Sequence, residues 1–201
     1  MTKIIIDQLQ TASVVSAAMI KNCQAGILQA AQMIIKTFKQ AGKVLLCGNG
    51  GSASQAQHIA AEMINKFRLD RSPLAAIALT TDTSNLTSIS NDFGFSYVFS
   101  KQVEALGKKG DVLIIITTSD VSLNEANFHS RNLGLALESA RKIGLKTIGL
   151  VSDKTKIALP LLDAAVKIPS SDTPRIQEGQ LLALHIICDL VEQAIFPKIN
   201  L

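Results

Sequence analysis

The sequence predicts an α/β fold in which a doubly wound, mostly parallel sheet of five strands is covered by helices. Three observations support this fold: a length of 201 residues, five short apolar runs, and helical segments that alternate with those runs. Because 47% of the residues are hydrophobic and the net charge is only +4, the chain can bury a core, which excludes disorder. We expect a single domain over residues 1–201, with a helical N-terminal segment (1–41) and an α/β core (42–201).

The elements follow from the spacing of the apolar residues. From Ile5 to Lys39 these residues recur at helical spacing, and Gly26 interrupts them, which predicts two helices or one bent helix. Continuous apolar runs are typical of parallel strands that are buried on both faces. Five such runs lie at residues 43–47, 74–79, 111–117, 146–151 and 164–168.

Helical segments separate the predicted strands. One begins in the glycine-rich turn after the first strand and should extend to about Phe67. The clearest of the others are expected over residues 133–143 and 174–196. The stretch from Ser119 to Arg131 is polar and unpatterned, so we expect it to be an irregular loop.

Composition also excludes several classes of protein. Three cysteines without CxxC spacing argue against a disulfide framework or a thiolate zinc site, and favour a reducing, cytoplasmic location. Asp7 directly follows the apolar residues 4–6 and argues against a signal peptide, and no stretch is apolar enough to span a membrane. A charge of +4 with only 4% aromatic residues argues against direct nucleic-acid binding.

Two segments are expected where parallel α/β sheets bind ligands, beyond the carboxyl ends of the strands. They are residues 48–54 after the first strand and 117–122 after the third. The glycine loop is neither GxGxxG nor a Walker loop, but the amides of Gly50 and Gly51 and the hydroxyl of Ser52 can cradle an anion. The alternative is a tight strand-to-helix turn with Ser52 as the N-cap.

Two histidines stand out among the three in the chain. His58 and Glu62 are four residues apart in a predicted helix, so both side chains leave one face and can share a proton or bind a metal. His185 lies in an apolar stretch of the last helix. The alternatives are an ordinary hydrogen bond on a helix surface for the first pair and a buried core histidine for the second.

These motifs together resemble the phosphoheptose isomerases of the SIS (sugar isomerase) domain superfamily. The resemblance covers essentially the whole chain and rests on residues 48–62, Ser90-Asn91-Asp92, Thr117-Thr118-Ser119, and Arg175-Ile176-Gln177-Glu178 with His185. It implies a single SIS domain and the conversion of sedoheptulose 7-phosphate to D-glycero-D-manno-heptose 7-phosphate, the first step toward the heptose of bacterial lipopolysaccharide. It also implies a zinc-containing homotetramer.

The same resemblance implies roles for individual residues. Glu62 would be the general base and His185 the acid, which agrees with the ordinary pKa values of these side chains. Zinc would be held by His58, Glu62, Gln177 and His185. The residues expected to bind substrate are Asn49, Gly50, Gly51, Ser52, Glu62, Asn91, Asp92, Thr117, Thr118, Ser119, Ser122 and Gln177.

Helix geometry constrains the zinc ligands. Gln177 and His185 are eight positions apart, roughly 12 Å along a continuous helix, so the metal must lie between them. Our hypothesis is that it occupies a groove at a subunit boundary, with the His58 helix of one chain against the last helix of another.

The chain departs from the family after the third strand. Asp120 stands where the family has a glycine, and an insertion of about nine residues (123–131) follows. A carboxylate about 4 Å from a phosphate would cost about 1 kcal/mol or more per charge, unless the loop turns it away. His129 and Arg131 of the insertion can supply compensating positive charge; the alternative is a solvated loop.

Two other functions stay open. Residues 63–67, 76–79, 101–106 and 187–190 with 196–197 resemble the DnaA initiator-associating proteins, non-catalytic tetrameric regulators of replication. Glu62 and His185 favour the enzyme, because a scaffold needs neither group. A sensor that binds a sugar phosphate without turnover is a third possibility, but it would not explain why both groups are present.

Overall fold

The computed structural model describes residues 1–124 and 126–197; residue 125 of the expected insertion and residues 198–201 of the expected domain lie outside it. One sheet has the strand order β2-β1-β3-β4-β5, and all four pairings are parallel, which confirms the predicted fold. The strands are β1 (Val44–Gly48), β2 (Ala76–Ala78), β3 (Val112–Ile116), β4 (Lys146–Ser152) and β5 (Ala164–Ile168).

The central strands explain where the ligand loops lie. Every residue of β1 and β3 is buried, as continuous apolar runs require. The strands pair in register from Val44 with Val112 to Gly48 with Ile116, so their carboxyl ends lie side by side. The strand order reverses between them, and loops that leave such a switch point in opposite directions open a crevice.

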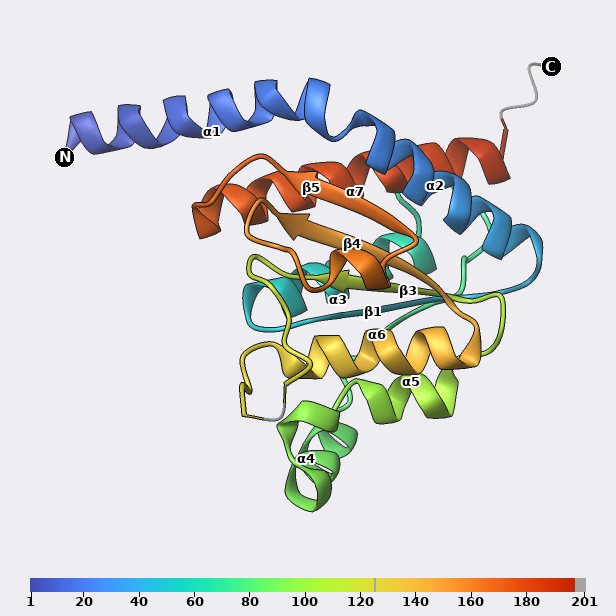
Figure 1. Cartoon of the computed structure of the whole chain (residues 1–201). Helices are drawn as coiled ribbons and strands as arrows, with labels where there is room; N and C mark the ends of the chain where they lie inside the picture. The colour runs from blue at the N-terminus through green and yellow to red at the C-terminus, as the bar shows by residue number, and fades with distance from the viewer. Residues whose placement is uncertain (125, 198–201) are drawn as a thin grey trace.

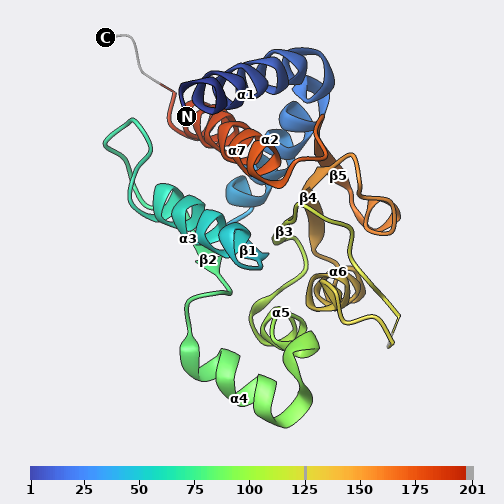
Figure 2. The same cartoon turned by 90° about the vertical axis from the view of Figure 1, so that its left-hand side faces the viewer.

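Helices cover both faces of the sheet (Figures 1 and 2). One face carries α1 (Thr2–Asn22), α2 (Gln24–Lys39), α3 (Gly51–Ile64) and α7 (Thr173–Ile195) over the larger apolar core. The other carries α4 (Thr83–Phe93), α5 (Ser100–Leu106) and α6 (Arg131–Ile143) over the smaller one. Two short 3-10 turns, η1 (Phe95–Tyr97) and η2 (Leu159–Leu161), complete the layers.

The N-terminal segment differs from the expectation in one detail. The chain forms two helices, but the break falls at Cys23, and Gly26 lies inside α2. A Cβ atom at Gly26 would overlap the carbonyl oxygen of Ala165, so this glycine lets α2 approach β5 closely. The predicted helix after the first strand ends at Ile64 rather than near Phe67.

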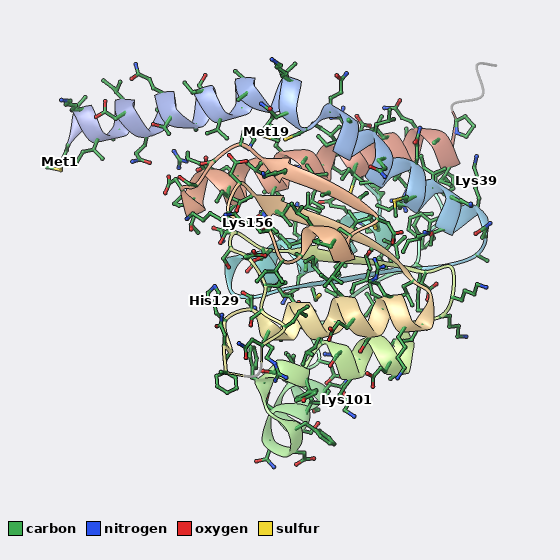
Figure 3. The ribbon with its side chains drawn as sticks, in the orientation of Figure 1. Met1, Met19, Lys39, Lys101, His129 and Lys156 are labelled. Atoms are coloured by element: carbon green, nitrogen blue, oxygen red, sulfur yellow. The ribbon has the colours of Figure 1, made fainter. Side chains whose placement is uncertain are left out.

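Helix α1 lies against α7, and its N-terminal half projects beyond the body, from Met1 toward Met19 (Figures 1 and 3). Several of its apolar side chains are largely exposed, among them Leu9 at 67% and Ile20 at 77%. In the part of the chain that the structure describes, no helix combines the length and the apolar character needed to cross a bilayer.

Candidate active site

Helices α3 and α7 bring the two predicted histidines together. The Nε2 atoms of His58 and His185 are 2.9 Å apart, although 127 residues separate them in sequence. Their rings meet edge to face, with centroids 5.2 Å apart. The carboxylate of Glu62, one turn after His58, approaches the same His58 Nε2 atom at 3.5 Å. These three side chains are called the histidine cluster below.

The cluster forms within one chain. Helices α3 and α7 pack against each other on the same face of the sheet (Figure 2). The contact between the His58 helix and the last helix, which we expected at a subunit boundary, is thus already made within one chain. Helices α3 and α7 both follow parallel strands and cover the same apolar core, so they contact each other within one chain.

Hydrogen bonding and burial set the protonation of the cluster. Because two Nε2 atoms face each other, one ring must donate and the other accept, so at least one is a neutral imidazole. Burial lowers the pKa of His185, the charge of His58 lowers it further, and Glu62 opposes them. His185 is therefore mostly neutral at pH 7 and can donate a proton from one nitrogen while accepting at the other.

The cluster partly fits a zinc ion. Two imidazole nitrogens and a carboxylate are the donor types that zinc prefers, and they already converge. Burial raises the pKa of the nearby Cys188 thiol to about 12, so this thiol is protonated in the structure as it stands. Over residues 1–124 and 126–197, however, no three His, Cys, Asp or Glu side chains are arranged as a formed metal site.

Gln177 lies apart from the other predicted ligands. A Cβ atom built at Gly51 would meet its side-chain amide, which places that amide over the start of α3. His58 is seven residues, or roughly 10 Å, further along the same helix. Within one chain, therefore, Gln177 lies beside the glycine loop rather than in the histidine cluster.

The glycine loop turns tightly into α3. Gly50 is the N-cap and has a φ of +53°, a conformation that glycine adopts at little cost. The expected alternative, Ser52 as N-cap, is wrong: Ser52 is buried inside the helix, and its amide donates to the Asn49 carbonyl. Asn49 exchanges two side-chain hydrogen bonds with Asn132 of α6, of 3.0 and 2.8 Å.

Residues 117–122, called the hydroxyl loop below, follow β3 beside the glycine loop. The Thr117 hydroxyl donates to the Ser119 carbonyl at 2.9 Å, and the Ser122 hydroxyl to the Asn124 carbonyl at 3.3 Å. The Ser119 Oγ atom lies 2.9 Å from the Nε2 of His129 on the inserted loop. The Thr118 carbonyl accepts a hydrogen bond from the Ser152 hydroxyl.

Asp120 does not face the crevice. Its carboxylate accepts hydrogen bonds from the amides of Lys156, Ile157 and Ala158, at 2.7 to 3.3 Å. These bonds tie the hydroxyl loop to the loop after β4. Of the two expected outcomes, the structure shows the turned loop, which directs the Asp120 carboxylate toward residues 156–158.

The Asn91-Asp92 pair lies elsewhere. Both residues are exposed in the last turn of α4, and the Asn91 amide donates to the Asp92 carboxylate at 2.9 Å. Helix α4 lies on the side of the sheet opposite the histidine cluster, outside α5 and in contact with η1 (Figure 2). Within one chain, the structure does not bring this pair to the cluster.

Two buried glutamines were missed by sequence reasoning. The Gln180 amide donates to the carbonyls of Thr117 and Leu150, which fixes α7 to the ends of β3 and β4. The Gln55 amide donates to the carbonyl of Gln177 and joins α3 to α7. Their only sequence signal is a polar residue on an otherwise apolar helix face, which does not reveal the partner.

Comparisons with known proteins show which family this chain belongs to. A family model described as SIS domain matches residues 9–152. Phosphoheptose isomerase of Helicobacter pylori strain P12 is 47% identical over 174 residues, 87% of this chain and 86% of the relative. Phosphoheptose isomerase of Trichlorobacter lovleyi is 44% identical over 196 residues, 98% of this chain and 96% of the relative.

The chain belongs to the phosphoheptose isomerase family.

Solved structures of that family share the fold. The phosphoheptose isomerase of Neisseria gonorrhoeae superposes with a TM-score of 0.86 at 37% identity, covering 96% of this chain and 98% of the other. The phosphoheptose isomerase of Francisella tularensis gives a TM-score of 0.88 at 34% identity, with the same coverage of each chain. The predicted SIS fold and the predicted class, a sugar-phosphate isomerase, are both confirmed.

Proposed function

We propose that this isomerase converts sedoheptulose 7-phosphate to D-glycero-D-manno-heptose 7-phosphate, with Glu62 as base and His185 as acid. The observation that carries the proposal is the histidine cluster, which brings a carboxylate and two imidazoles from distant parts of the chain to one place. Such a cluster has the groups that an aldose-ketose isomerisation needs. Family membership supports the substrate class.

The proposed reaction moves one proton between two neighbouring carbons. Glu62 removes the proton from the carbon beside the carbonyl, which leaves an enediolate, and returns it to the former carbonyl carbon. His185, mostly neutral at pH 7, donates a proton to the developing oxyanion and recovers one from the neighbouring hydroxyl. No net proton is gained or lost.

Zinc is the cofactor we infer. His58, Glu62 and His185 would hold it, because they are donor types that zinc prefers and both other side chains lie close to His58; their side chains would have to rearrange to surround the ion. When bound, zinc would polarise the substrate carbonyl as a Lewis acid. Glu62 cannot be a full zinc ligand and a strong base at once, so its two proposed duties compete.

The phosphate would be bound at the carboxyl ends of β1 and β3. Ser52, Thr117, Ser119 and Ser122 supply hydroxyls there, and α3 begins with Gly51, whose amide belongs to the N-terminal turn that attracts anions. Asp120 faces the other way, so it does not weaken this proposal. Asn49 lies beside the same turn and is paired with Asn132, so a sugar hydroxyl would use the second amide hydrogen or the second oxygen lone pair of Asn49.

The decisive experiment is a turnover assay. Purified protein with zinc and sedoheptulose 7-phosphate should form the aldose, and Glu62→Gln or His185→Gln should reduce the rate at least 100-fold. Glu138→Gln, an exposed carboxylate on α6 across the sheet, is the matched control and should keep full activity. No turnover in the wild-type protein, together with binding to the replication initiator, would instead support the regulator.

We also infer a homotetramer in the cytoplasm. The exposed apolar side chains of α1, and a groove of about 420 Å³ lined by Met19, Ile27 and Leu182 among others, support burial against further copies of the chain. The three cysteines are buried and unpaired, which supports a reducing compartment. Light scattering should give four times the chain mass for the wild type and a smaller species for Leu9→Glu.

A further inference from the structure

Helix α7 carries a second ionisable group on the face that bears His185. Glu192 follows His185 by seven residues, two helical turns, so both point toward α3. Unlike His185, Glu192 is nearly inaccessible, with 2% of its side chain exposed. A carboxylate buried to this degree needs several hydrogen-bond donors, and the position of these donors indicates the role of Glu192.

The Glu192 carboxylate binds three successive amides and a guanidinium. The amides of Phe67, Arg68 and Leu69 donate to it at 3.0, 2.8 and 2.9 Å, and the Nε of Arg71 donates at 2.9 Å. Burial alone would raise the pKa of Glu192, but these donors together lower it. The loop after α3 is thus wrapped around one charged group of α7.

Arg71 continues the connection to the catalytic helix. Its guanidinium nitrogens donate to the carbonyls of Glu62 at 2.9 Å and of Met63 at 2.8 Å, in the last turn of α3. These carbonyls have no partner within the helix, so the arginine caps the C-terminal end. The backbone of the proposed base is therefore held by the ion pair between Arg71 and Glu192.

The same loop places an aromatic ring on the proposed acid. The Phe67 ring stacks on the His185 imidazole, with centroids 5.6 Å apart and planes 29° apart. The His58 ring contacts His185 edge to face. His185 thus lies between a fixed aromatic ring and its cluster partner, which restricts rotation about its χ2 angle.

We propose that Glu192, Arg71 and Phe67 are positioning residues that hold Glu62 and His185 in their reactive arrangement. None of the three is a proposed zinc ligand or substrate-binding residue. They influence the reaction only through Glu62 and His185. This inference rests on the proposed function. Because a proton transfer depends on sub-ångström placement of acid and base, loss of positioning should lower kcat while KM stays nearly constant.

The test compares Glu192→Gln with Asp163→Asn. Asp163 is also a hydrogen-bonded carboxylate, bound by Lys146 and Thr147, but it precedes β5 and lies outside the site. Both variants should lower the melting temperature. Only Glu192→Gln should lower kcat, by 10- to 100-fold, with KM within twofold of the wild type. Equal kcat values for the two variants would overturn the proposal.

A second pair of variants separates the ring from general packing. Phe67→Leu keeps an apolar side chain but removes the flat ring, and Phe67→Tyr keeps the ring. We expect Phe67→Leu to lower kcat about tenfold and Phe67→Tyr to keep kcat within twofold of the wild-type value. A Phe67→Leu protein with wild-type kcat would contradict the positioning role.

An NMR measurement tests the same geometry without turnover. The chain has three histidines, so the imidazole signals of histidine-labelled protein can be assigned with single His→Gln variants. The ring current of Phe67 should displace the His185 signal, and Phe67→Leu should abolish this displacement while the His129 signal stays in place. An unchanged His185 signal would refute the stacking, whereas absent turnover with a changed signal would refute only the proposed function.

Discussion

The histidine cluster and the hydroxyl loop lie on the same domain but are built in opposite ways. The cluster joins two long helices whose ends are tied by a buried ion pair and an aromatic stack. The loop consists of irregular backbone whose hydroxyls bond to neighbouring carbonyls and to an inserted histidine. The groups that we propose to move protons are thus held by packed helices, while the groups that we propose to bind and release a phosphate lie on a loop.

The largest effect should come from the cluster. His58→Ala removes the imidazole beside His185 and one proposed ligand, so kcat/KM should fall at least 100-fold and bound zinc should be lost. Metal analysis and the turnover assay measure the two effects. His129→Ala is the matched control in the loop and should keep its zinc. Full zinc content in His58→Ala would show that this residue is no ligand.

Removing the carboxylate of Asp120 should weaken the fold more than binding. Asp120→Ala leaves the amides of residues 156–158 without their acceptor, so the free energy of unfolding should fall by about 1–2 kcal/mol in urea titrations. KM should stay within twofold, because the carboxylate faces away from the crevice. A clearly lower KM would mean that Asp120 does repel the substrate phosphate.

The inserted loop should affect substrate binding only. His129→Ala removes the partner of the Ser119 hydroxyl, and we expect KM to rise about threefold to fivefold, equivalent to about 1 kcal/mol or less, with kcat unchanged. Ser119→Ala should do the same, and the double variant should show non-additive effects. Independent effects would indicate that the two side chains act separately.

The smallest effect concerns acid stability. The pKa of Glu192 is lowered in the folded state, so its ionised carboxylate stabilises the fold at pH values above the ordinary carboxylate pKa. This stabilisation is lost as the pH falls through the lowered pKa. Glu192→Gln, though less stable at pH 7, should therefore lose less stability than the wild type between pH 5 and 3. Urea titrations across that range measure the difference; parallel curves would contradict it.

Local patterns were sufficient for the elements and for one half of the site. Buried apolar runs located all five strands, and the His58–Glu62 spacing was a correct indication of a shared helix face. Patterns failed where a single residue has two plausible explanations. Gly26 resembled a helix break but is a point of close packing, and Ser52 resembled an N-cap but is buried inside the helix.

The sequence by itself determined the fold class, the glycine and hydroxyl loops and the groups that carry the chemistry, because side-chain spacing follows the period of a helix or strand. Only the tertiary structure decided which of these groups meet. The contact of His58 with His185, the turning of Asp120 toward residues 156–158, and the bonds of Glu192 to residues 67–69 join positions from 36 to 127 residues apart. Such contacts depend on strand order and helix packing, which no local period encodes.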